Sequence, residues 1–366
     1  MKKLRMIYKW ILISVMLQTA ILAYINYVYL PNRGQFRATM YEIEVLPVKN
    51  RSFKLPKGAE NVSVSFDGLY AAYRLDGKLE IADLDRGKTI KKLESGDGEF
   101  SFFRWLPDRE MLIYSIKEPE GKSGRVRIST YDIIPELDRS YPDIKNLPEE
   151  SEVIGIELSP LTNIVYPKIQ TSDTRARIYR FDIMDELNLI FKTDLTTIIK
   201  ETMYTDNLVY QPEGQKITIR NGKSGKTSYV PVKEAGLLLA VDDNDFIYAG
   251  ARDESGKIEA IYYGKAGQKE DEWKSLKPET PAAWEDIFIT AGGAIFTADR
   301  DNGRVTCLKA AEGREAGGTA EAGVAGEAGV AGAIGESRFD GSLLAVLDDY
   351  VVSIDGNKLI LKAINR

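Results

Sequence analysis

Apolar runs and tight turns alternate along most of the chain in one repeating pattern. After residue 60, an apolar run, a turn led by Asp, Pro or Gly, and a second apolar run containing Tyr recur about every 40 to 50 residues. The clearest copies begin at Val64, Phe103 and Ile156. Paired strands at this spacing are typical of β-propeller blades. The pattern therefore predicts an all-β fold of repeated, four-stranded antiparallel sheets.

Tracing the pattern to the end of the chain predicts a seven-bladed β-propeller. In the first blade, the strands Tyr70–Leu75 and Lys78–Ala82 are joined by Asp76-Gly77, a strong signal for a hairpin. The third blade is less regular, because Met184–Ile199 could hold a helical turn in place of the last strand. The first strand of the fourth blade is expected at Thr202–Tyr204. Six blades, with blade four or six misread, are the alternative.

The two ends of such a ring have to be joined, because exposed strand edges promote aggregation. The last blade begins at Leu343 and provides only three strands before the chain ends, whereas a spare strand, Ser52–Leu55, precedes the first blade. We expect this early strand to supply the missing outer strand of blade seven. Hydrogen bonds would then close the ring.

Residues 311–337 interrupt the pattern with Ala, Gly and Glu, and they include the tandem repeat 321–326 and 327–332. Such a segment has almost no bulky apolar side chain to bury, so it cannot offset its ordering entropy. We expect a mobile loop between the third and outer strands of blade six. A tolerated repeat expansion explains it better than an elastic linker, because added loop length costs little free energy.

The N-terminal region follows a different pattern. From Ile11 to Leu30 almost every residue is apolar, and a helix of this length spans about 30 Å, the thickness of the hydrocarbon core. Trp10 and several tyrosines lie near the two ends of this run, as interfacial aromatic residues do. Basic residues gather before the run, which predicts a cytoplasmic N-terminus. They are Lys2, Lys3, Arg5 and Lys9, against Arg33 and Arg37 after it.

We interpret this run as an uncleaved signal anchor. A cleaved signal peptide, the alternative, would have a shorter apolar stretch and small residues before the cut. The expected organisation is a basic cytoplasmic N-terminus (1–10), a transmembrane anchor in contact with membrane lipid (11–30), a connector (31–51) and an extracytoplasmic propeller (52–366). We therefore expect a single-pass protein of the plasma membrane.

Composition removes several classes of function. The chain has no histidine, which excludes histidine-based triads, histidine metal sites and imidazole switches. Its one cysteine, Cys307, cannot form an internal disulfide, and we expect a buried structural thiol in the apolar run 305–308. The formal charge of −6, with no basic cluster after the first nine residues, argues against a nucleic-acid partner. We expect no cofactor and no metal.

Acidic residues in the turns after the innermost strands form the sharpest group of candidate site residues. On one face near the central channel they could bind a hard cation or a basic partner. Asp is also common in turns because its side chain hydrogen-bonds the local backbone, and we favour this local role. The turn Asp299–Gly303 resembles the start of a calcium loop, but it lacks the later bidentate Glu and fits a hairpin. The candidate acids are Asp67, Asp108, Asp206, Asp242, Asp243, Asp348 and Asp349.

Two short sequence motifs resemble those of a known family. Ser65–Gly68 and Trp105–Arg109, each followed by a strand that contains Tyr, resemble the WD-like repeat of TolB-type propellers. The same repeat occurs in the propellers that cap prolyl oligopeptidase-type peptidases. The resemblance covers about residues 52–366, is specific in blades one to three, and implies a binding or scaffolding platform, often in the cell envelope. The resemblance assigns no catalytic residues to this sequence. The chain also lacks the Gly-x-Ser-x-Gly nucleophile elbow of a peptidase domain.

These observations predict a non-enzymatic, membrane-tethered propeller that binds an envelope protein, peptide or polymer through its loops. The competing hypothesis is an extracytoplasmic hydrolase or lyase that uses carboxylates on a polysaccharide in the channel. A propeller can bring distant acids together, but no spacing in the sequence singles out a catalytic pair. The fold alone does not decide between the two hypotheses.

Overall fold

The computed structural model describes residues 2–29, 48–121, 123–182, 184, 186–311 and 334–364. The chain divides into two compact units, Met1–Pro47 and Val48–Arg366. Within the described residues, the first unit contains one long helical segment and the second contains all of the strands.

The first unit is built on an apolar helix. The α-helix α1 (Lys2–Tyr24) continues into a π-helical turn, η1 (Ile25–Tyr29). The segment Arg5–Tyr27 has a mean hydropathy of 1.7 and is long and apolar enough to cross a membrane. An N-terminal signal sequence meets the same criterion, so what is confirmed is the long apolar helix itself.

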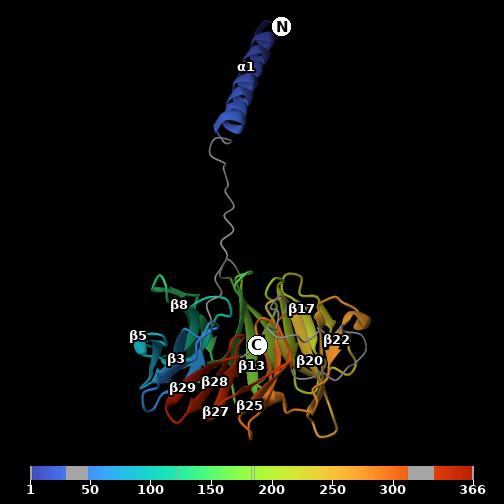
Figure 1. Cartoon of the computed structure of the whole chain (residues 1–366). Helices are drawn as coiled ribbons and strands as arrows, with labels where there is room; N and C mark the ends of the chain where they lie inside the picture. Colours follow the sequence, from blue (N-terminus) through green and yellow to red (C-terminus); the bar gives the residue numbers. More distant parts are fainter. Residues whose placement is uncertain are drawn as a thin grey trace. The chain divides into compact units, whose positions relative to one another are not determined.

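The second unit is a seven-bladed β-propeller (Figure 1). The strands form seven separate antiparallel sheets, six of them with four strands. In blade two, β9 and β10 both pair with β8, so the outer edge of this sheet is divided between two short strands. Seven blades are therefore confirmed, and the six-bladed alternative is wrong.

The first strand of each blade is the innermost strand of its sheet and the fourth is the outermost. Two short 3-10 helices, η3 (Glu270–Glu272) and η4 (Trp284–Asp286), flank the last strand of blade five. In order from the inside outward, the blades consist of β2 (Glu60–Val64), β3 (Tyr70–Leu75), β4 (Lys78–Asp83) and β5 (Lys88–Leu93); β6 (Glu99–Trp105), β7 (Met111–Glu120), β8 (Ser123–Asp132), with β9 (Leu137–Ser140) and β10 (Ile144–Leu147); β11 (Glu152–Ser159), β12 (Ile164–Gln170), β13 (Arg175–Phe181) and β14 (Leu187–Asp194); β15 (Ile198–Glu201), β16 (Asn207–Gln211), β17 (Thr218–Asn221) and β18 (Thr227–Tyr229); β19 (Leu237–Val241), β20 (Phe246–Arg252), β21 (Ile258–Lys265) and β22 (Lys274–Leu276); β23 (Ile287–Ile289), β24 (Ile295–Asp299), β25 (Arg304–Lys309) and β26 (Gly335–Arg338); and β27 (Ser342–Val346), β28 (Tyr350–Asp355), β29 (Lys358–Ala363) and β1 (Arg51–Lys54).

The middle strands of the blades are buried on both faces, because each sheet packs between two neighbours. In β12 the first six residues are all buried. Such strands are continuous apolar runs, whereas a sheet with one wet face would alternate apolar and polar residues. Apolar clusters fill the spaces between blades, and the cluster between blades seven and one contains Phe53, Tyr73 and Leu361.

The predicted closure of the ring is confirmed. β1 pairs with β29 as the outer strand of blade seven, with Arg51 opposite Leu361 and Phe53 opposite Leu359. Phe53 is buried, and the backbone N–H of Leu55 extends the pairing to the carbonyl of Asn357 at 2.8 Å. The closure therefore joins the two ends of the propeller by strand pairing and by a shared apolar cluster.

The side chain of Arg51 links the closing strand to both neighbouring blades. Its guanidinium hydrogen-bonds the carboxylate of Asp85 in blade one at 2.6 Å, and it donates to the hydroxyl of Tyr350 in blade seven. The closure is thus held by the polar contacts of Arg51 at the start of β1 and by the apolar cluster that contains Phe53.

The Ala, Gly and Glu segment connects β25 with β26, so its predicted place between the third and outer strands of blade six is confirmed. Its expected mobility concerns residues 312–333, which lie outside the described residues. Ala311, where the segment begins, is buried.

The prediction of a first strand at Thr202–Tyr204 is wrong. The strand is β15, which ends at Glu201, and Thr202–Tyr204 belongs to the turn after it. Side chains build this turn: the hydroxyl of Thr202 donates to the carbonyl of Thr205 and accepts from the N–H of Asn207. Hydrogen bonds of this local kind replace the strand ladder.

The helical alternative for Met184–Ile199 is also wrong within the described residues. β14 pairs with β13 from Leu187 to Asp194, and β15 begins at Ile198. Cys307, expected to be a buried structural thiol, is only partly buried on β25, where it packs against the apolar cluster of blades six and seven.

The closing strand provides a test of the fold. Replacing Phe53 with alanine should lower the free energy of unfolding by about 3 to 5 kcal/mol, because it removes the buried aromatic side chain that β1 contributes to the closure. Lys54→Ala, on the exposed side of the same strand, is the matched control and should change stability by less than about 0.5 kcal/mol. Denaturant unfolding of the two variants checks this, and equal stability would contradict closure by β1.

Candidate functional site

Two sets of turns share one side of the propeller. The turns between first and second strands lie close to the channel, because the first strands are innermost. Since the strands alternate in direction, the turns between third and fourth strands lie on the same side. We call this side the first-turn face. Each of the seven predicted acids lies in a first turn, in blades one, two, four, five and seven.

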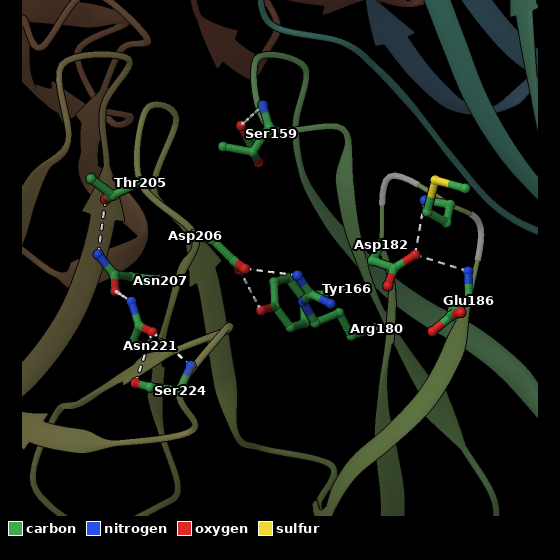
Figure 2. Close-up of polar contacts among 12 residues, drawn as sticks. Ser159, Tyr166, Arg180, Asp182, Glu186, Thr205, Asp206, Asn207, Asn221 and Ser224 are labelled. Atoms are coloured by element: carbon green, nitrogen blue, oxygen red, sulfur yellow. Dashed lines mark hydrogen bonds and ion pairs between the residues drawn. The ribbon is translucent and has the colours of Figure 1, made fainter. Parts of the chain in front are cut away.

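Asp206 ties blade three to blade four. Its carboxylate accepts hydrogen bonds from the hydroxyl of Tyr166 at 3.0 Å and from the guanidinium of Arg180 at 2.7 Å (Figure 2). Both partners belong to blade three, and Asp206 itself is buried. Burial and the Asp206 charge raise the pKa of Tyr166, which keeps its hydroxyl protonated. The first role of this acid is therefore to join two blades.

Asp67 and Asp242 build their own turns. Asp67 accepts hydrogen bonds from the Ser65 hydroxyl at 2.6 Å and from the N–H of Leu69 at 3.0 Å. Asp242 accepts the N–H groups of Asn244 and Phe246, and the hydroxyl of Tyr248 at 2.8 Å. Both match the local role of Asp in turns.

The acids of blades two and seven also have partners. Asp348 accepts the hydroxyl of Thr290 at 2.5 Å and the N–H of Gly292 at 3.1 Å, so it joins blade seven to blade six. Asp108 pairs with the adjacent Arg109 at 2.6 Å. Asp349 lies beside Tyr350. Burial raises the pKa of Tyr350, Arg51 lowers it and the Asp349 charge raises it, and the net shift is upward.

Asp243 differs from the other acids. Within the described residues no hydrogen bond reaches its carboxylate. Burial, followed by the charges of Asp348, Asp242 and Asp108, raises the pKa of Asp243 to about 7. These acids come from blades two, five and seven, so the structure brings them together around the channel opening on the first-turn face.

Asp245 is an inter-blade acid that the sequence analysis did not single out. Its carboxylate accepts the N–H of Met203 at 2.6 Å, the N–H of Tyr204 at 2.9 Å and the hydroxyl of Thr205 at 2.9 Å. It is buried, and it holds the first turn of blade four from blade five. Its position in the acidic run 242–245 could have marked it as a candidate. Its partners could not be predicted, because they lie about forty residues away along the chain.

Glu201 is the second acid that the sequence did not reveal. It ends β15, is only 8% exposed, and neither carboxylate oxygen has a hydrogen-bond partner among the described residues. Burial and the nearby charges of Asp206, Glu157 and Asp245 raise its pKa well above the ordinary range. A neutral carboxyl is the consistent form at this position, because an unpaired buried charge is costly.

Glu157 shows the opposite behaviour on the neighbouring inner strand. It pairs with Arg104 at 3.1 Å and with Lys200 at 3.0 Å, and these three side chains link the inner strands of blades two, three and four. Burial acts to raise the pKa of Glu157, but Lys200 and Arg104 together hold it below its ordinary value. The charges on these inner strands therefore compensate one another.

Hollows on the described surface include two that are not lined by any predicted acid. One of about 630 Å³ lies beside Arg175, Asp194 and Tyr210 of blades three and four. The other, of about 480 Å³, lies between blades five and six beside Lys257 and Arg300. Among the described residues, no group of three or more acidic or cysteine side chains is arranged to hold a metal ion.

Comparison with known proteins supports the fold alone. No protein-family model matches the chain, and no curated protein matches it. Among solved structures, Hsv2p of Kluyveromyces lactis is similar with a TM-score of 0.50 and 13% identity, over 82% of this chain and 90% of that one.

The β-propeller domain of Cps50 (Swd1) from Myceliophteria thermophila is similar with a TM-score of 0.50 and 11% identity, over 87% of this chain and 100% of that one. TolB from Acinetobacter baumannii aligns with a TM-score of 0.41 and 14% identity, over 71% of this chain and 61% of that one. The strand topology and the likeness to the Cps50 β-propeller domain confirm the expected propeller architecture.

The raised pKa of Asp243 predicts a pH dependence of stability. In the folded protein the pKa is about 7, above its ordinary value of 3.8, so the folded state binds the proton more tightly. The free energy of unfolding therefore falls as pH rises between these two values and levels off above pH 7. Asp243→Asn lacks this titration, so its stability relative to the wild type should increase from pH 5 to pH 8. Urea unfolding at both pH values measures this, and a difference independent of pH would contradict it.

Proposed function

We propose that the protein is a single-pass membrane protein whose extracytoplasmic propeller binds a protein, peptide or polymer of the cell envelope. The apolar segment Arg5–Tyr27 would be the anchor, with the basic N-terminus in the cytoplasm. The organisation into residues 1–10, 11–30, 31–51 and 52–366 belongs to this proposal. The propeller would act as a scaffold without catalytic activity.

One observation carries the binding function: the first-turn face exposes large apolar side chains to solvent. Leu161, Met184 and Tyr204 are 53%, 76% and 65% exposed. Six of the seven predicted acids, in contrast, have partners within the propeller. Exposed apolar groups gathered on one face are typical of interaction sites.

The chain enters the propeller on this same face. Asn50 accepts the N–H of Ala363 at 2.8 Å beside the beginning of β1, and β29 ends on the first-turn side. In the proposed arrangement the connector therefore joins the propeller on the face that carries the exposed apolar residues.

A second candidate function, an extracytoplasmic hydrolase or lyase for polysaccharides, is favoured by Asp243. A carboxyl with a pKa of about 7, close to Asp348, Asp242 and Asp108, is the kind of group that serves as a general acid. Neither the hollow beside Arg175 nor the hollow beside Arg300 is lined by these acids. We therefore place this function second.

The membrane placement predicts a one-sided protease sensitivity. Protease added to intact cells or spheroplasts should degrade the propeller and leave cytoplasmic control proteins whole. Carbonate extraction should leave the chain in the membrane fraction. Protection of residues 52–366 in intact cells would contradict the proposed topology, and release of a shorter soluble form would favour a cleaved signal peptide.

The binding function predicts a retained partner and no turnover. After crosslinking in intact membranes, the full-length chain should recover a defined protein or envelope polymer, and the purified chain should leave envelope glycans unchanged. Asp243→Asn serves as the diagnostic variant, because a catalytic acid would lose its activity on this substitution. Glycan cleavage that is abolished by Asp243→Asn would replace the binding function with the enzymatic one.

A further inference from the structure

The same turn is repeated in two neighbouring blades. Residues 132–137 read Asp-Ile-Ile-Pro-Glu-Leu and residues 182–187 read Asp-Ile-Met-Asp-Glu-Leu. Each segment follows the third strand of its blade, so both turns lie on the first-turn face of blades two and three. The repeat conserves an acid at the start, an apolar residue at the third position and a glutamate at the fifth.

The leading Asp of each repeated turn accepts a hydrogen bond from the N–H of the third residue, and the side chain of that residue is exposed. Asp132 accepts the N–H of Ile134 at 3.2 Å, and Asp182 accepts the N–H groups of Met184 at 2.9 Å and Glu186 at 3.0 Å (Figure 2). Ile134 is 75% exposed and Met184 is 76% exposed. In both turns the third residue exposes a large aliphatic side chain, and its N–H donates to the leading Asp.

The first turns of blades three and four add two more exposed apolar residues, Leu161 and Tyr204. The Ser159 hydroxyl joins these turns, because it donates to the carbonyl of Met203 at 2.5 Å and accepts the N–H of Thr162. Asp245 holds the backbone on both sides of Tyr204. The tyrosine is therefore exposed on a backbone fixed from both neighbouring blades.

Polar contacts join the turns of Leu161, Met184 and Tyr204, and the turn of Ile134 lies in the neighbouring blade two. The ion pair between Arg180 and Asp206 connects the strand end before Met184 to the turn that carries Tyr204 (Figure 2). The Ser159 hydrogen bond connects the turn of Leu161 to the turn of Tyr204. We call this surface the docking face, defined by Ile134, Leu161, Met184 and Tyr204.

Acidic residues occur in three of the four turns, 132–137, 182–186 and 202–206, and none of the four turns contains Lys or Arg. Basic residues are close by, because the turn 221–226 of blade four contains Lys223 and Lys226 and its Gly222 donates to the carbonyl of Asp206 at 2.8 Å. Glu136 and Glu186 are exposed next to the apolar side chains. The exposed carboxylates of Glu136 and Glu186 attract cationic groups that come close to Ile134 and Met184. A partner that covers the apolar residues would have to bring positive charge to the rim.

We propose that the docking face binds a polypeptide segment in which apolar side chains are interspersed with Lys or Arg. This inference rests on the proposed binding function and specifies the partner and the blades that it contacts. The apolar side chains of the segment would cover Leu161, Met184 and Tyr204, and its basic groups would lie against Glu136 and Glu186. A segment without basic residues would leave the Glu136 and Glu186 carboxylates without an opposite charge at the edge of an interface that excludes water.

The test is a selection of random-sequence peptides displayed on phage against the full-length chain in neutral phosphatidylcholine nanodiscs. Enriched peptides should combine apolar residues with Lys or Arg, and their binding should weaken as salt is raised. Tyr204→Ser and Met184→Ser should each weaken a selected peptide by about tenfold, because each removes a central apolar contact. These variants lie on different turns, and both turns are held by backbone hydrogen bonds that the substitutions keep.

Matched controls lie elsewhere on the propeller. Tyr229→Ser removes a tyrosine of similar exposure, 60%, on the outer strand β18 of blade four, and should leave binding unchanged. Glu186→Lys should abolish selection of basic peptides, whereas Glu254→Lys, in the exposed hairpin of blade five, makes the same charge change and should not. No enrichment, enrichment of acidic or uncharged peptides, or binding that survives both Tyr204→Ser and Met184→Ser would overturn the proposal.

The outcome separates this inference from the function on which it rests. A crosslinked partner that is retained equally by the wild type and by Tyr204→Ser would leave the binding function standing and overturn the docking face. Loss of every partner from the wild-type chain would overturn the binding function itself.

Discussion

The pairing of β1 with β29 is the constraint on which the remaining structure depends. Without it, blade seven has three strands and an open edge, and blade one packs against an incomplete neighbour. Phe53 and Arg51 show that the closure uses both apolar burial and charge, because one fills the cluster between blades seven and one and the other reaches Asp85. The pairing adds an outer strand and the Phe53 side chain to the apolar cluster through which blades seven and one pack together.

Acidic turn residues extend the same principle around the ring. Asp206, Asp245 and Asp348 each accept hydrogen bonds from the preceding or following blade. These bonds lie in buried or half-buried positions, where a charge-assisted hydrogen bond is strong and its loss is costly. The chain therefore uses carboxylates where many small extracellular domains use disulfides, which its single cysteine cannot form within the chain.

The sequence pattern predicted the strands and turns, and the strand missing from the last blade also predicted the pairing of β1 with β29. Blade number, the hairpin at Asp76-Gly77 and the closing strand all followed from alternating runs and turn residues. The contacts of Asp206 with Tyr166 and Arg180 could not be predicted, because they join residues 40 and 26 positions apart through the packing of two sheets. Glu201 was missed because a glutamate at a strand end is ordinarily solvated, and only the neighbouring turns bury it. Thr202–Tyr204 was misassigned because side-chain hydrogen bonds there replace strand pairing.

The closing strand also determines how the propeller would respond to force. Any tension that reaches the propeller through residue 48 is applied first to Asn50 and then to the four residues of β1. That strand is the only outer strand not preceded in the chain by the rest of its own sheet, so it can be pulled away while β27, β28 and β29 stay in place. A load on the N-terminal side would therefore open the ring at blade seven before any other blade is disturbed. The strength of this molecule under tension is set by one short strand, whatever the stability of the remaining six blades.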